Sequence, residues 1–365
     1  DVPFAAWLKS FFKEHKKFGS KDRKYIAHLC YCYFRLGRAF AEVSMVEKIG
    51  IGLFLCSDEA SNLLQAVHSE WNERAHLSVS KKLQMLNRAG EEEKIFAFNH
   101  LLSKEIETVP FNLSFLVQPP VYLRLRPGKA QKVKETFLSA GVPFEVVDEA
   151  CIAVGSNTKV EEYLQLDADA VVQDWSSQRV LEVLPPIILK GKVNIWDCCA
   201  ASGGKSILAW DHFQKVELTA SDIRQSILHN LRARFTRAGI HPYHAFVADV
   251  SKASPFSQKF DLVICDAPCS GSGTWGRTPE QLLFFEESKV DHYASLQKRI
   301  VTNAAQNVKK GGHLLYITCS VFERENEDLV RFVQENLSFT LHKSAYLKGY
   351  DKKSDTLFAA AFTAL

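Results

Sequence analysis

The sequence predicts an α/β protein in three parts: an all-α segment over residues 1–110, a small α/β unit over 121–186 and a doubly wound α/β domain over 187–365. Two observations carry this prediction. Apolar residues recur at helical spacing in the first part, and after Pro186 strand-like apolar runs alternate with amphipathic helical stretches. With 46% hydrophobic and 24% charged residues, the composition is that of a globular protein rather than a disordered one.

The first 110 residues show the apolar periodicity of helices. The runs are 7–12, 25–36, 83–86 and 95–102. Residues 1–40 contain nine Lys or Arg and three acids, with aromatic residues among them. Cations beside rings suit single-stranded RNA, whereas rings at helical spacing are as often core with the lysines on a solvated face. Both interpretations stay open.

A proline-containing stretch, 109–120, separates this part from the small α/β unit. We expect a strand at 121–125, a helix at 129–140 and a strand at 144–147. Only one acid, Glu135, stands within the basic cluster of this unit, which is a second candidate for phosphate contacts: Arg124, Arg126, Lys129, Lys132 and Lys134.

The third part alternates strands and helices. Strands are predicted at 193–197, 216–222, 260–266 and 313–318, and helices at 223–238, 292–308 and 326–337. Ligands of doubly wound sheets bind at the carboxyl ends of the strands. Acids end four successive segments there: Asp197, Asp222, Asp249 and Asp266. Capping of the following helix is the alternative role for such acids.

A loop of small residues, Cys199-Ala200-Ala201-Ser202-Gly203-Gly204-Lys205, follows the first of these strands. Small residues let the backbone approach a ligand, and the following helix presents free N–H groups. A triphosphate-binding loop requires Gly five positions before Gly204, where this chain has Cys199, and the dinucleotide fingerprint is also missing. An S-adenosylmethionine site fits better, with Asp222 on the ribose hydroxyls and Asp249 on the adenine amine.

Two cysteines, Cys269 and Cys319, follow strand ends at the same predicted edge. A thiolate that adds to C6 of cytosine makes C5 nucleophilic toward a sulfonium methyl group, after which a base removes the C5 proton. We expect a helix just after Cys319 to lower its pKa, and Asp266 to bind cytosine N3 and the exocyclic amine.

The other cysteines are interpreted as structural thiols, with Cys199 assigned to the loop: Cys30, Cys32, Cys56, Cys151, Cys198 and Cys265. No Cys-x-x-Cys or His-x-x-x-His spacing predicts a metal. An odd cysteine count, no apolar run of membrane-spanning length and no signal-like start predict a cytoplasmic protein, which we expect to be a monomer.

These blocks, with Val172–Gln178 and Tyr316–Glu327, resemble the Sun/Fmu group of RNA cytosine-5 methyltransferases over residues 120–365. The resemblance implies a Rossmann-like S-adenosylmethionine-dependent methyltransferase domain, preceded by an RRM- or ferredoxin-like subdomain and a NusB-like all-α RNA-binding domain. The Thr-Cys-Ser block separates this group from DNA cytosine-5 methyltransferases, whose nucleophile is the Cys after Pro.

Carried over residue by residue, the resemblance implies that Cys319 attacks C6, that Cys269 assists product release, and that Cys199–Lys205, Asp222, Asp249 and Asp266 hold the cofactor. The family loop usually has Pro where this chain has Ser202. RNA contacts are expected at Arg277, Arg124, Arg126 and Lys129. Likeness of residues 19–26 to ribosomal RNA members favours ribosomal RNA; a transfer RNA enzyme or a non-catalytic ribosome-assembly factor are the alternatives.

Overall fold

The structure, a computed structural model, describes residues 2–186, 191–213 and 215–365. Contacts divide the chain into two compact units, Asp1–Pro119 with Thr274–Glu287, and Pro120–Gly273 with Ser288–Leu365. The predicted boundary in the stretch 109–120 therefore coincides with a division between units. No pattern in the sequence predicts that residues 274–287 join the first unit.

The described part of the first unit contains helices and no strand. The α-helices are α1 (Phe4–Glu14), α2 (Ser20–Arg35), α3 (Met45–Leu55), α4 (Asn62–Val67), α5 (Ser69–Glu73), α6 (Val79–Met85), α7 (Thr108–Ser114) and α12 (Gln281–Phe284). The helix predicted at 95–102 is wrong: only the 3₁₀ turns η1 (Glu91–Lys94) and η2 (Asn99–Leu101) form there. Phe96 and Phe98 are both buried against Trp275, and burial two positions apart does not fit one helical face.

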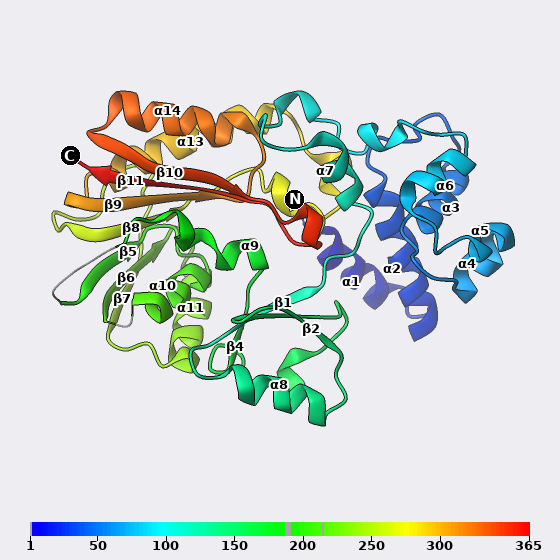
Figure 1. Ribbon diagram of the computed structural model, residues 1–365, viewed down its shortest axis with the longest axis horizontal. Coiled ribbons are helices and arrows are strands. Elements are labelled where there is room, and N and C mark those ends of the chain that lie inside the picture. Colours follow the sequence, from blue (N-terminus) through cyan, green and yellow to red (C-terminus); the bar gives the residue numbers. More distant parts are fainter. Residues whose placement is uncertain (1, 187–190, 214) are drawn as a thin grey trace. The chain divides into compact units, whose positions relative to one another are not determined.

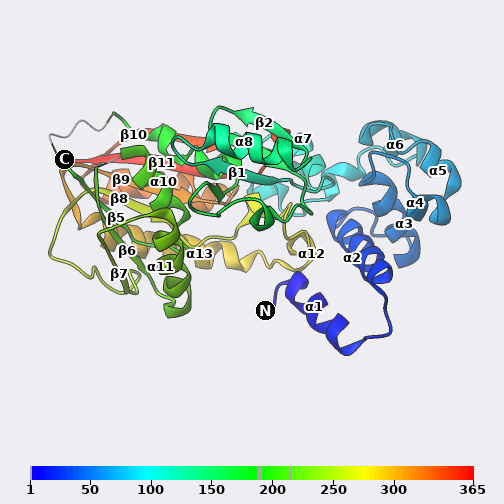
Figure 2. The ribbon, with the colours of Figure 1, turned by 90° about the horizontal axis from the view of Figure 1, so that it is seen from below.

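The small α/β part of the second unit is an antiparallel sheet of order β2-β3-β1-β4. Its strands are β1 (Val121–Leu125), β2 (Phe144–Asp148), β3 (Cys151–Val154) and β4 (Ala170–Val172), with helix α8 (Ala130–Ser139) and the 3₁₀ turn η3 (Val160–Glu162). This is the ferredoxin-like arrangement with its second helix reduced to a 3₁₀ turn. Figure 2 shows α8 beside β1 and β2.

The large sheet has the order β10-β11-β9-β8-β5-β6-β7. Strands β5 (Val193–Asp197), β6 (Val216–Asp222), β7 (Tyr243–Val247), β8 (Phe260–Asp266) and β9 (Val308–Thr318) are parallel, and β10 (Phe339–Leu347) and β11 (Leu357–Ala364) add an antiparallel edge. The order reverses at β5, so the crevice beside its carboxyl end is the expected ligand site.

Helices cover both faces of this sheet, with α10 (Gly204–Phe213) and α11 (Gln225–Ala238) on one face and α13 (Ser288–Ala305) and α14 (Glu327–Asn336) on the other (Figure 1). The short helix α9 (Trp175–Gln178) and the 3₁₀ turns η4 (Val180–Val183), η5 (Ser272–Thr274), η6 (Glu323–Glu325) and η7 (Tyr350–Lys352) complete the described elements. Coverage on both faces explains why β5 and β8 read as continuous apolar runs. No helix in the described ranges is both long and apolar enough to span a bilayer.

Candidate active site

A cavity of about 470 Å³ lies at the carboxyl ends of β5, β6, β8 and β9. It brings together seven of the predicted site residues: Cys199, Ala201, Asp222, Asp249, Asp266, Cys269 and Cys319. Ile223, Arg224, Ser251, Leu296 and Ile300 also line it and were not predicted. Leu296 and Ile300 belong to one face of α13, and nothing in the sequence tells which helix face closes a cavity.

The predicted loop residues Ala200, Ser202, Gly203, Gly204 and Lys205 are not among the residues that line the cavity. Gly203 has φ 86°, and a Cβ there would lie 2.6 Å from Phe235 Cε1 of α11. The glycine is therefore needed for packing at the start of α10, in addition to any role beside a ligand.

Ser202 is tethered at the position where the resemblance led us to expect Pro. Arg234 Nη1 donates to Ser202 Oγ at 3.0 Å and to its carbonyl oxygen at 3.2 Å, while Arg234 Nη2 donates to Asp167 Oδ1 at 2.7 Å. A hydrogen bond to α11 thus restrains the loop where a pyrrolidine ring would have stiffened it.

Asp222 is held at the cavity wall by backbone and side-chain donors. Ala201 N donates to its Oδ2 at 3.0 Å, and Arg224 N and Nε donate to its Oδ1 at 2.9 and 3.0 Å. Burial alone raises the pKa of Asp222, but these hydrogen bonds, Arg224 first, outweigh burial and lower it. Asp249 accepts from Ser251 Oγ at 2.6 Å, which lowers the pKa of Asp249 as well.

Asp197, the first of the four strand-end acids, does not line the cavity. It is fully buried and accepts from Ser206 Oγ at 2.6 Å, near the start of α10. Burial raises the pKa of Asp197 to about 7. Asp197 therefore contacts the helix that follows it rather than a ligand. This is the alternative role that was considered for such acids.

The two predicted thiols lie together, with Cys269 Sγ 3.3 Å from Cys319 Sγ. The hydrogen bond to Cys319 and then burial raise the pKa of Cys269, which favours its protonated form, and either sulfur can be the donor in this contact. The helix predicted just after Cys319 is wrong. Thr318 Oγ1 accepts from Ser320 N and Ser320 Oγ accepts from Phe322 N, and such hydroxyl turns replace helical hydrogen bonds until α14 begins at Glu327.

Lys205 supplies the positive charge that the missing helix was expected to supply. Its Nζ lies 2.7 Å from Asp266 Oδ2. Burial by itself lowers the pKa of Lys205, but Asp266 outweighs burial and raises it, and Cys319 is close enough to contribute in the same direction. Lys205 therefore places a positive charge beside Asp266 at the carboxyl edge of the sheet.

Two arginines of the basic cluster in the small unit pair inside the fold. Arg124 is buried and pairs with Asp211 of α10 at 2.6 Å; Arg126 Nη2 lies 2.8 Å from the same carboxylate and also donates to Ala238 O. Burial of Arg124 argues against a direct contact with RNA, but its RNA contact stays a prediction. Arg126 and Lys129 border an open hollow, and their RNA contacts stay predictions as well.

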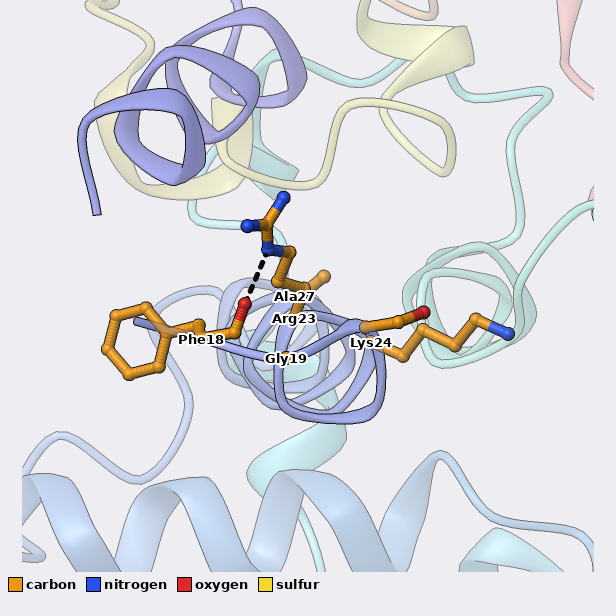
Figure 3. A pocket seen from close by; sticks show the side chains of 6 residues that line it. Phe18, Gly19, Arg23, Lys24 and Ala27 are labelled. Carbon is orange, nitrogen blue, oxygen red and sulfur yellow. Dashed lines mark hydrogen bonds between the residues drawn. The ribbon is translucent and has the colours of Figure 1, made fainter. Parts of the chain in front are cut away.

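Arg277 belongs to the segment that packs with the first unit, and its RNA contact likewise stays a prediction. In that unit a shallow hollow beside α2 is lined by Phe18, Gly19, Ser20, Arg23, Lys24 and Ala27. Figure 3 shows Phe18, Arg23 and Lys24 pointing in different directions, with Arg23 Nε donating to Phe18 O at 2.8 Å. Diverging cations do not form a site for one anion.

The remaining cysteines differ in burial. Cys32, Cys151, Cys198 and Cys265 are buried, whereas Cys30 and Cys56 are partly exposed. Cys198 also lines the cavity, beside Cys199. Across the residues that the structure describes, no group of three or more His, Cys, Asp or Glu side chains is arranged to hold a metal ion.

The strand order and the cavity at the switch point define a Rossmann-like methyltransferase domain, as the sequence predicted. The fold agrees over 97% of the chain and 93% of the other with the crystal structure of PH0851, at a TM-score of 0.72 and 21% identity. Residues 187–356 match the family described as 16S rRNA methyltransferase RsmB/F. The predicted kinship with the Sun/Fmu group is confirmed over this part of the chain.

Two curated relatives bear on the substrate. Ribosomal RNA small subunit methyltransferase B of Xanthomonas campestris pv. campestris is 34% identical over 44% of this chain and 36% of its own length. The tRNA (cytosine(49)-C(5))-methyltransferase of Pyrococcus abyssi is 31% identical over 46% of this chain and 54% of its own length. The chain thus spans about half of these relatives or less.

Proposed function

We propose that this chain transfers a methyl group from S-adenosylmethionine to C5 of cytosine in RNA, with Cys319 as the covalent nucleophile. The observation that carries the proposal is the thiol pair, 3.3 Å apart on the wall of a cavity that three carboxylates also line. Two adjacent thiols on one cavity wall suit a nucleophile with an assisting group beside it.

The residues of the cavity fit the cofactor. Asp222 and Asp249 are carboxylates at adjoining strand ends, where ribose hydroxyls and an adenine amine find acceptors, and apolar Ile223 and Leu296 offer contacts for a ring. S-adenosylmethionine supplies an electrophilic methyl group when it is bound. Arg224 occupies outer positions of the Asp222 carboxylate and must turn away for a ribose to bind there.

The reaction follows from the remaining side chains. Cys319 Sγ forms a bond to C6, Asp266 binds N3 and the exocyclic amine, and Lys205 stabilises the thiolate before attack. The enamine carbon C5 then takes the methyl group. Loss of the C5 proton to a base restores the C5–C6 double bond as the bond to Cys319 breaks, and Cys269, beside Cys319, assists this release.

Methyl-tritiated S-adenosylmethionine with unmodified RNA tests the proposal. We expect label in small-subunit ribosomal RNA transcripts, because the matched family and the Xanthomonas relative carry that description. Label in transfer RNA alone would favour the second candidate, which the Pyrococcus relative supports. RNA binding without label in either substrate would overturn the enzyme in favour of a non-catalytic RNA-binding factor.

A further inference from the structure

A buried carboxylate, Glu325, lies behind the two thiols and has no part in the chemistry proposed above. It belongs to η6 and is fully buried, as is Gln297 of α13, which donates to Glu325 Oε2 at 2.8 Å. Neither side chain is among those that line the cavity. A buried charge requires hydrogen-bonding partners, so its contacts indicate what it holds in place.

Those contacts reach both cysteine loops. Glu325 Oε2 accepts from Ser270 N at 2.9 Å, and Glu325 Oε1 accepts from Ser320 Oγ at 2.7 Å. Gln297 Nε2 also donates to Pro268 O at 2.9 Å. The residues before and after Cys269, and the residue after Cys319, are thereby tied to one pair of side chains.

We infer that Glu325 and Gln297 form a clamp that fixes the distance between the Cys269 and Cys319 sulfurs. This inference rests on the proposed function in assigning that distance to catalysis. Glu325 is then a positioning residue, because it acts through the loops and touches neither cofactor nor base. Direct bonds between the loops, such as Ser270 Oγ to Ser320 Oγ at 3.1 Å, depend on the same alignment.

The hydrogen-bond geometry suits a carboxyl group, which has two acceptor oxygens. Burial raises the pKa of Glu325, and the hydrogen bonds from Ser270, Ser320 and Gln297 oppose this rise without outweighing it. All three partners donate to its two oxygens. An amide at the same place offers one acceptor oxygen and leaves one donor facing another donor.

Phenylarsine oxide measures the geometry directly, because one trivalent arsenic condenses with two neighbouring thiols and releases one water. Peptide mass spectrometry identifies the bridge between Cys269 and Cys319. We expect Glu325→Ala and Gln297→Ala to slow this bridging, and to lower kcat for methyl transfer by about 100-fold, the effect of misplacing a reacting group by about 1 Å. Binding of S-adenosylhomocysteine should be unchanged, and Glu325→Gln should fall between wild type and Glu325→Ala.

Glu323→Ala is the matched control, since Glu323 is on the same turn but 40% exposed, and it should behave like wild type. Wild-type bridging in both clamp variants would overturn the clamp. Loss of cofactor binding in parallel with bridging would also overturn it, because it would show general unfolding. A wild-type protein that methylates no RNA, yet needs Glu325 for bridging, would remove the proposed function and leave the clamp intact.

Discussion

The carboxyl edge of the large sheet and strand β1 of the small sheet both carry polar residues that the sequence assigned to function. At the large sheet the assigned cysteines and three of the acids line one cavity. On β1 the assigned arginine, Arg124, is buried and neutralised by Asp211. The position of a residue at a strand end follows from the topology of the sheet. The exposure of a charged residue within a strand depends instead on what packs against it.

The small sheet also lacks a free face for bases. Leu123, Leu125 and Phe137 form a core between the sheet and α8. On the opposite face Tyr122 is buried with Cys151 and its hydroxyl donates to Lys352 O. RRM-type recognition stacks bases on exposed sheet aromatics. The likeness to that subdomain is therefore one of topology, and the sheet joins the catalytic domain instead.

The largest expected effect is at the large sheet. Cys319→Ala should lower methyl transfer by at least about 1,000-fold, because the covalent route is lost. Cys269→Ala should instead accumulate a protein–RNA adduct that survives denaturing electrophoresis. Cys30→Ala, in the other unit, serves as the thiol control. An adduct in Cys319→Ala, with none in Cys269→Ala, would reverse the two roles.

The second largest effect is expected at Arg124 in the small sheet. Arg124→Met leaves Asp211 buried without this partner and should lower the free energy of unfolding by about 3 kcal/mol, measured by urea denaturation. The dependence of RNA affinity on salt should not change, because a buried guanidinium is not placed to neutralise a phosphate. Lys129→Met is the comparison and should leave stability nearly unchanged. A smaller salt slope in a fully stable Arg124→Met protein would instead support the RNA contact of Arg124.

Substitution of Gly203 and of its neighbour Gly204 tests whether packing requires glycine at position 203. Gly203→Ala combines positive φ with a clash on Phe235 and should cost about 2 kcal/mol of stability. A Cβ on Gly204 would meet nothing within 4 Å, so Gly204→Ala should be close to neutral in the same thermal unfolding assay. Equal losses in the two variants would show that clash and backbone strain at Gly203 are not the cause.

The smallest effect is a pH dependence at Asp197. Its pKa rises from 3.8 in the unfolded reference to about 7 in the fold, so the folded state holds the proton more tightly. Its contribution to stability is therefore full below pH 4 and is lost as the pH rises to 7. Asp197→Asn should remove this loss, and its melting temperature should gain on wild type between pH 5 and 8. A constant difference across that range would contradict the raised pKa.

The sequence by itself determined several strands, and with them the meeting of Asp222, Asp266, Cys269 and Cys319. Short apolar runs mark these strands, and parallel strands bring their carboxyl ends to one edge. The antiparallel strands β3, β4, β10 and β11 were not predicted. Strands β1, β5, β6 and β8 have the predicted bounds. Local pattern is sufficient for these features because each depends on neighbours in sequence.

Tertiary structure alone decided which charged side chains pair inside the fold and which remain available to bind a ligand. Asp211 and Arg124 are 87 residues apart, and their pairing lies inside the fold. Lys205 turns to Asp266 rather than lining the cavity, and Glu325 reaches Ser270 across 55 residues. Desolvation and ion pairing depend on what lies beside a side chain in space, and no local pattern in the sequence encodes that neighbour.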